Sequence, residues 1–128
     1  MHRSEVVERY WRFHALSTSS VRQDRLESIS YFDAWEHVEE LAQSDPEECL
    51  AVICDLAEAA SSDQALAYLG AGLLENLLHQ HPDYAEAVSD VARRAPSFRA
   101  ALRCVADSAL PDTEGGIELR RLRDEPPG

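Results

Sequence analysis

Residues 65–79 read ALAYLGAGLLENLLH, which is the most apolar stretch of the chain. Its leucines and alanines favour helix, whereas each glycine at an interior helical position costs about 1 kcal/mol relative to alanine. We therefore expect a kinked helix, or two short helices that meet, near Gly70 and Gly72. Because glycine has no side chain, another part of the backbone can also approach closely at this point.

On both sides of this stretch, apolar residues recur at helical spacing. They predict further helices over residues 4–16, 29–43, 46–60, 84–95 and 96–109. The third of these has the clearest start, because Asp45 can cap free N–H groups and Pro46 suits the first helical position. Ser4 is the expected N-cap of the first helix. The polar residues 17–28 are expected to form a connector.

No segment alternates apolar and polar residues long enough to build a sheet, so the predicted fold class is all-α. We expect a compact antiparallel bundle of five to six short helices over residues 1–111, forming one domain. Helix starts at Pro46, Pro82 and Pro96 favour HEAT-like stacking as another arrangement, although no residue-level repeat accompanies them. Residues 112–128 contain paired glycines and paired prolines and are expected to form a flexible tail.

The charge of the chain is strongly negative, with 24 acidic residues against 12 arginines, no lysine and a net charge of -12. Residues 24–92 hold sixteen of the acids and a single base, Arg25. Such a surface disfavours nucleic-acid binding and contact with anionic membranes. It permits a basic protein partner, whose approach would be electrostatically steered. Simple solubility is the alternative explanation.

The candidate binding residues lie on the polar sides of the predicted helices or within the apolar stretch. The acidic ones are Asp33, Glu36, Glu40, Glu47, Glu48, Asp55 and Glu58. Glu75 and Asn76 are polar residues inside the apolar stretch and would present a carboxylate and an amide near a helix start. A solvated helix face is the alternative interpretation for the acids, and a capping role is the alternative for Glu75.

Motifs of catalysis and metal binding are missing from the sequence. We find no nucleophile elbow, phosphate loop, dinucleotide fingerprint or zinc-protease helix. His79 and His81 are two residues apart, whereas helical metal sites use a spacing of four. The three cysteines, Cys49, Cys54 and Cys104, occupy apolar positions and are expected to act as small hydrophobic residues. No cofactor, metal ion or catalytic residue is therefore expected.

Four motifs occur in order: FDAWEHVEEL at 32–41, DPEECL at 45–50, AYLGAGLLENLL at 67–78 and APSFRAAL at 95–102. Together they resemble an uncharacterised family of small bacterial all-helical proteins of unknown function, with the signature Ala-Gly-Pro-Leu-Glu-Asp-Leu-Leu. The resemblance covers about residues 30–108. Leu73 stands in place of the signature proline and Asn76 in place of its aspartate, which favours a continuous kinked helix here. By analogy, the resemblance implies an accessory, immunity or interaction protein.

The leading functional hypothesis is a non-enzymatic, acidic protein-binding module, such as an immunity or antitoxin-like protein that neutralises a basic partner. One alternative is a structural subunit or homodimer, because the apolar faces of residues 84–95 and 98–109 are nearly ideal. Another is an enzyme with a site near Glu75 and His79, which would require at least two of Glu75, His79 and His37 to converge in a pocket. The charged N-terminal residues and the lack of an apolar span predict a cytoplasmic protein.

Overall fold

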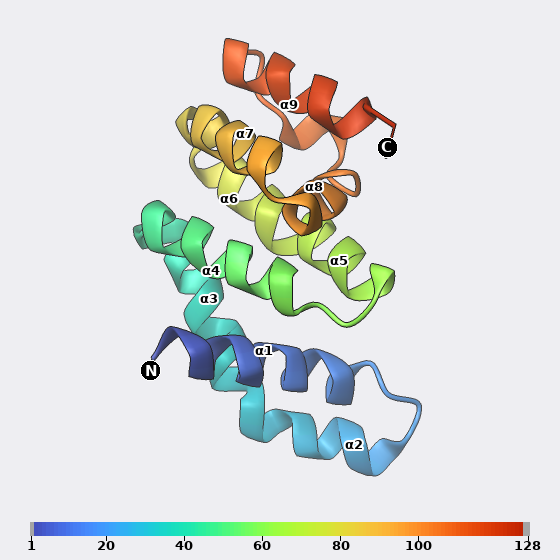
Figure 1. The fold of residues 1–128 in the computed structure, drawn as a ribbon. Helices are drawn as coiled ribbons and strands as arrows, with labels where there is room; N and C mark the ends of the chain where they lie inside the picture. The colour runs from blue at the N-terminus through green and yellow to red at the C-terminus, as the bar shows by residue number, and fades with distance from the viewer. Residues whose placement is uncertain (1, 127–128) are drawn as a thin grey trace.

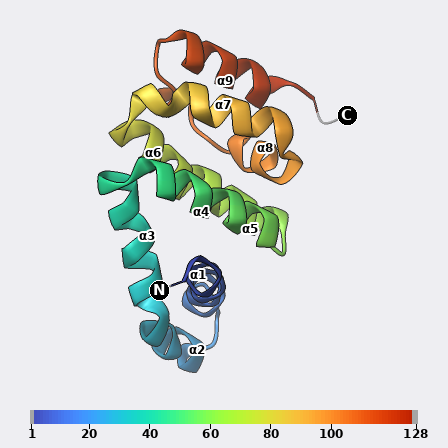
Figure 2. The ribbon, with the colours of Figure 1, turned by 60° about the vertical axis from the view of Figure 1, so that its left-hand side comes forward.

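The computed structural model describes residues 2–126, and over that range the chain is all-α, as predicted. The helices follow one another along a stack (Figures 1 and 2). Their bounds are α1 (Arg3–Ser17), α2 (Arg22–Glu27), α3 (Phe32–Ser44), α4 (Pro46–Ala59), α5 (Asp63–Leu69), α6 (Glu75–Gln80), α7 (Ala85–Arg94), α8 (Pro96–Leu102) and α9 (Glu114–Asp124). No helix within the described range is both long and apolar enough to cross a membrane.

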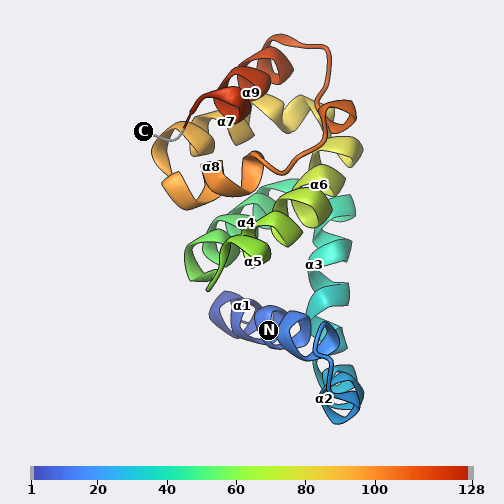
Figure 3. The same ribbon diagram turned by 90° about the vertical axis from the view of Figure 1, so that its right-hand side faces the viewer.

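The stack has α1 and α2 at one end and α9 at the other (Figure 1). α1 packs against α3 and α4, α4 packs against α5 and α8, and α7 lies between α8 and α9. α3 runs lengthwise and joins the end formed by α1 and α2 to the layer of α4 and α6 (Figure 3). One hydrophobic core extends through the stack, from Val6 and Tyr10 of α1 to Leu119 and Leu122 of α9.

The start of α4 is capped as the sequence predicts, whereas the start of α1 and the segment before α3 differ from the prediction. Asp45 Oδ1 accepts a hydrogen bond from the Glu48 backbone N–H at 3.2 Å, and Pro46 opens α4, as predicted. Ser4 is not the N-cap of α1, because His2 holds that position and its Nδ1 accepts from the Ser4 N–H. The predicted connector 17–28 contains a further helix, α2, between two short turns.

The apolar stretch forms one continuous helical run in which α5 and α6 are joined by a π-helical segment, η2 (Gly70–Leu74). Four of its buried residues, Ala65, Leu69, Leu73 and Leu77, recur at a spacing of four. A regular helix of 3.6 residues per turn would rotate this row by about 40° at each step. The wider π turn offsets that drift, so the row stays directed at the core.

The two glycines of this run have different roles. A side chain at Gly70 would overlap the carbonyl oxygen of Ala101 in α8, so the close backbone approach expected here is confirmed. At Gly72 no atom lies within 4 Å of the place that a Cβ would take. Close packing between α5 and α8 therefore requires glycine at the first position only.

The prediction of a flexible tail from residue 112 is wrong over residues 114–124, which form α9. Thr113 caps this helix, since its Oγ1 accepts a hydrogen bond from the Gly116 N–H at 3.1 Å. Leu119 and Leu122 then point into the core and are fully buried. Residues 127–128 of the predicted tail lie outside the described range.

The paired glycines of α9 mark close packing, where the sequence pattern suggested disorder. A Cβ on Gly115 would crowd the backbone at Glu86, and one on Gly116 would overlap the carbonyl oxygen of Pro111. α9 can therefore lie directly against the start of α7. It can also lie against Pro111, in the segment that leads into α9 itself.

The apolar faces that suggested self-association are covered within the chain. Ala85, Val88 and Ala92 of α7 are buried, and α7 packs against both α8 and α9. The last predicted helix ends at Leu102 instead of 109, and Phe98 and Leu102 are also buried. These faces therefore supply no free surface for a second copy.

Candidate binding surface

α3 and α4 position most of the predicted binding residues. The buried side of α3 carries Ala34, Val38 and Ala42, which fixes the orientation of the helix on the core. Asp33, Glu36 and Glu40 lie on the opposite, exposed side. Glu47 follows at the exposed corner where α3 passes into α4.

Three of the predicted acids form ion pairs with arginines of α1. Asp33 pairs with Arg9 at 2.7 Å. Glu48 pairs with Arg3 at 2.9 Å, and Asp55 lies 3.9 Å from the same guanidinium. The hydrogen bond from Arg9 lowers the pKa of Asp33, and the one from Arg3 lowers the pKa of Glu48. These acids thus hold α1 against α3 and α4.

Glu36, Glu40 and Glu47 are exposed and make no ion pair with any residue in the range 2–126. We call these three residues the acidic strip. Glu36 and Glu40 are one turn apart on the outer side of α3, and Glu47 lies in the first turn of α4, just after the corner between the two helices. Their charge is therefore available to solvent or to a partner.

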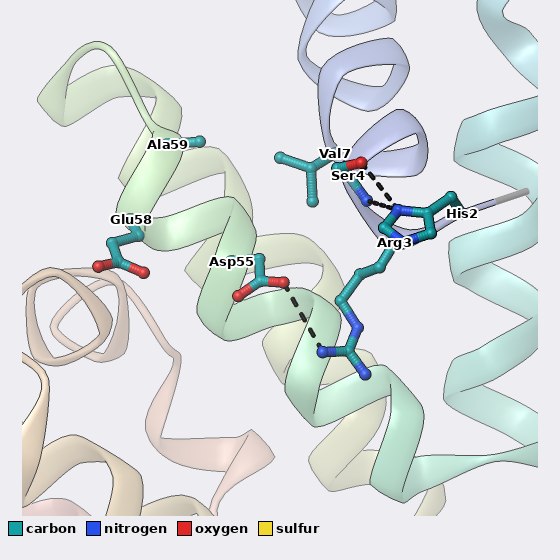
Figure 4. Close-up of a pocket in the computed structure, with 7 residues that line it drawn as sticks. All are labelled: His2, Arg3, Ser4, Val7, Asp55, Glu58 and Ala59. Carbon is teal, nitrogen blue, oxygen red and sulfur yellow. Dashed lines mark hydrogen bonds and ion pairs between the residues drawn. The ribbon is translucent and has the colours of Figure 1, made fainter.

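Glu58 lies apart from the acidic strip, at a pocket of about 510 Å³ between the start of α1 and the end of α4. Figure 4 shows Arg3 extending along α4 toward Asp55, while Glu58 and Ala59 lie about one turn further along that helix. His2, Ser4 and Val7 complete the lining. Because Arg3 already engages two carboxylates, the pocket holds opposite charges and gives no strong preference for an ion.

Glu75 and Asn76 both make contacts within the protein. Glu75 Oε2 accepts a hydrogen bond from the Ala106 N–H at 3.0 Å. Asn76 Nδ2 donates to Glu39 Oε2 at 2.8 Å, which joins α6 to α3. Burial raises the pKa of Glu39, and the hydrogen bond from Asn76 partly opposes that shift. Glu39 was absent from the predicted set, because only the fold brings α3 beside α6.

A second pocket, of about 500 Å³, brings Glu75 and His79 together with Asn76 and Ser108. His37 does not line it and lies near Glu48 on the other side of α3. Two of the three residues named for the enzymatic alternative therefore share a pocket, which is the convergence that this alternative requires. One carboxylate oxygen of Glu75 is engaged by the Ala106 backbone N–H, and an enzymatic role for the pair stays a hypothesis.

The described residues supply no metal-binding cluster, and burial disfavours the thiolate form of two of the cysteines. Within residues 2–126, no three His, Cys, Asp or Glu side chains lie close enough to hold a metal ion. Cys49 is buried, and burial raises the pKa of its thiol to about 12. Cys54 is half-buried and its pKa is also raised by burial. Cys104 is exposed, contrary to the expectation that all three cysteines pack as hydrophobic residues.

Comparison with known proteins gives a family but no activity. Neither a curated protein nor a solved structure matches the chain. One family model, described as a family of unknown function (DUF6869), matches residues 21–121, from just before α2 into α9. This range includes all four motifs on which the resemblance to an uncharacterised family rested. The chain therefore belongs to the family of unknown function DUF6869.

Proposed function

We propose that this protein is a non-enzymatic binding module that uses its acidic strip to engage a basic protein surface. The observation that carries the proposal is the contrast among the acids of α3 and α4. Asp33, Glu48 and Asp55 are paired with arginines, whereas Glu36, Glu40 and Glu47 are exposed and unpaired among the described residues. Three exposed carboxylates on two consecutive helices favour a partner of opposite charge.

The rest of the molecule supports the same role. We take the helices as a HEAT-like stack that serves as a rigid frame, since α3 is held in place by its buried face and by the ion pair of Asp33 with Arg9 of α1. The net charge of -12 would accelerate the approach of a basic partner at low salt. An immunity or antitoxin-like protein of the bacterial cytoplasm, which neutralises a basic toxin, is the specific form of this proposal.

The proposal is tested by affinity capture from the native host at low salt, followed by titration of the captured protein against two matched variants. Glu36→Gln/Glu40→Gln/Glu47→Gln removes the acidic strip. Asp63→Asn/Asp83→Asn/Glu86→Gln removes the same charge from exposed positions elsewhere. We expect the strip variant to bind roughly tenfold more weakly and the control within about twofold of wild type, because each exposed ion pair contributes up to about 1 kcal/mol.

Two results would contradict the proposal. Equal weakening by both variants would mean that only the net charge matters. An affinity that does not change with salt concentration would exclude an electrostatic contact.

A further inference from the structure

The pocket of about 500 Å³ beside the π-helical segment lies between two parts of the chain that are distant in sequence. One wall comes from η2 and α6, and the other from η4 (Asp107–Ala109), a short 3-10 turn that follows α8. The Glu75 carboxylate of the first wall accepts the backbone N–H of Ala106, just before the second. This hydrogen bond holds the two walls beside each other.

Gly72 lines this pocket, although the packing of the helices does not require glycine there. No atom lies within 4 Å of the place that a Cβ would take, and the backbone of Gly72 is not left-handed. Glycine is nevertheless the least favourable residue in a helix apart from proline, and π-helical turns are frequent at functional sites. A residue that breaks a local rule without a structural reason is typical of such sites. We therefore attribute Gly72 to the space that it leaves open in the pocket.

The polar groups of the pocket are mainly acceptors of hydrogen bonds. Glu75 Oε2 is engaged by the Ala106 N–H, whereas Oε1 has no partner among residues 2–126. Asn76 Nδ2 donates to Glu39 at 2.8 Å, which leaves Oδ1 as the atom of this amide that can accept. The Ser108 hydroxyl also lines the pocket and can accept as well. A ligand of this pocket is therefore expected to carry hydrogen-bond donors.

The charge that faces the pocket is negative. Glu75 is the one carboxylate among the lining residues, none of them is an arginine, and His79 completes the polar lining. On the side of η4, Asp107 is already paired with Arg120 and Arg123, at 3.1 and 3.0 Å. These two guanidinium groups are thus engaged outside the pocket. The Glu75 carboxylate remains as the charge that a ligand would meet, and it favours a cation.

We propose that this pocket binds a primary ammonium group, either that of a small amine or that of a lysine side chain. An ammonium group is a compact cation with three donors, which matches one carboxylate oxygen, one amide oxygen and one hydroxyl. A guanidinium group fits less well, because its planar fork prefers both oxygens of a carboxylate and the backbone already engages one oxygen of Glu75. The pocket shares no residue with the acidic strip, so its test is independent of the proposed function.

The probe for the test is n-butylammonium, which reproduces the side chain of lysine without its backbone. 1-Butanol and butyrate are neutral and anionic comparisons of the same chain length, and n-butylguanidinium carries the alternative cation. Binding at physiological salt is followed by nuclear magnetic resonance, through the backbone amide signals of Gly72, Asn76 and Ser108. We expect n-butylammonium to shift these signals in a saturable way, with a Kd on the order of 10 mM for so small a ligand.

Two variants with matched controls locate the contact. Glu75→Gln removes the charge and keeps an oxygen for the Ala106 N–H, and its control is Glu27→Gln, at an exposed position of α2. Gly72→Leu fills the pocket with a residue that favours helix, and its control is Gln64→Leu, at an exposed position of α5. We expect the first variant of each pair to bind n-butylammonium at least about fivefold more weakly, and each control to stay within about twofold of wild type.

The Gly72→Leu variant separates a loss of binding from a loss of folding. Leucine favours the helical state more than glycine does and meets no neighbour at this position. We therefore expect the variant to be at least as stable as the wild-type protein in thermal unfolding, while its binding is weakened.

Four results would overturn the proposal. Shifts of equal size with 1-butanol would mean that the pocket recognises the apolar chain. Tighter binding of n-butylguanidinium would assign the pocket to the other cation. Equal weakening by Glu75→Gln and Glu27→Gln would mean that the amine follows only the net charge of the protein. No saturable shift of the three signals with n-butylammonium would reject the site.

A last measurement distinguishes the two sources of the ammonium group. Nα-acetyl-lysine N-methylamide carries the same side chain on a segment of peptide backbone. Binding at least as tight as that of n-butylammonium would identify a lysine side chain as the ligand. Exclusion of this compound, while n-butylammonium still binds, would identify a small free amine.

Discussion

The two ends of the stack differ in how far their last helix is packed against the rest of the chain. α9 buries Gly116, Leu119 and Leu122 against α7 and α8. α2 buries none of its six residues. In stacks of helices the end elements normally present a polar outer face, and both helices do so except at Ile117 of α9 and Leu26 of α2, which are 64 and 51% exposed. Within the described residues the α9 end is therefore closed by buried contacts, whereas the α2 end is open.

The outer side of α9 shows how the closed end is held in place. Arg121 and Arg93 both contact the Glu118 carboxylate, and the hydrogen bond from Arg121 is the main reason that its pKa falls to about 2. Because the folded-state pKa lies below the ordinary value, this contribution is present above about pH 4.5 and is lost as the pH falls toward 2. At the open end, hydrogen bonds join Asp24 and Arg25 of α2 to Ser19, but α2 forms no ion pair within the described residues.

The largest expected effect comes from breaking the closed end. Leu119→Ala removes a fully buried side chain between α9 and α7 and should lower the free energy of unfolding by about 2–5 kcal/mol. Ile117→Ala, two residues away and 64% exposed, should change it by less than about 0.5 kcal/mol. Urea unfolding followed by circular dichroism measures both. Equal effects would mean that α9 does not pack as described.

A second prediction concerns the helical run that links the two ends. Gly70→Ala should destabilise the protein by about 1–3 kcal/mol, because the new methyl group would overlap the carbonyl oxygen of Ala101. Gly72→Ala meets no neighbour and should stabilise the protein by about 0.5–1 kcal/mol, since alanine favours the helical state. Thermal unfolding of the two variants measures both effects. A loss of stability in both would contradict the different roles of Gly70 and Gly72.

A third prediction concerns pH and the layer of α1. The His14 ring packs 4.3 Å from Tyr68, its Nδ1 has no hydrogen-bond partner in residues 2–126, and burial lowers its pKa. The unfolded chain then binds the proton more readily, so stability should fall as the pH drops through about 6.5. His14→Gln should flatten this dependence between about pH 7.5 and pH 5. An unchanged slope in the variant would assign the titration to another group.

The smallest effect is expected at the open end. Ile29→Ser replaces a side chain that is 70% exposed and should leave the free energy of unfolding within about 0.5 kcal/mol of wild type. Chemical denaturation of Ile29→Ser and Leu119→Ala under the same conditions compares their free energies of unfolding. A loss as large as that of Leu119→Ala would mean that the Ile29 side chain is already covered within the protein.

The fold class and most helix positions follow from local signals. The cap at Asp45 and the buried row that begins at Ala65 can both be found in the sequence, because each depends on neighbours a few residues away. The failure at α9 has a definite cause. The paired glycines Gly115 and Gly116 favour disorder, but Thr113 as a cap and leucines at 119 and 122 predict a helix over the same residues.

The binding surface is less predictable, because it depends on contacts between distant residues. The sequence shows that residues 24–92 are acidic, but it does not show that Arg3 and Arg9 neutralise Glu48 and Asp33, 45 and 24 residues away. The same limit hid the contact of Asn76 with Glu39.

The π-helical segment has a consequence for how the length of the chain can change. A single residue removed from a regular helix turns everything beyond it by about 100° and misaligns the buried face. The wide turn at η2 already holds the equivalent of one additional residue. Removal of the exposed Ala71 would convert this turn to regular helix while α5 and α6 keep their faces on the core. In this protein, we therefore expect η2 to be the place in the helical core that most readily tolerates a one-residue deletion.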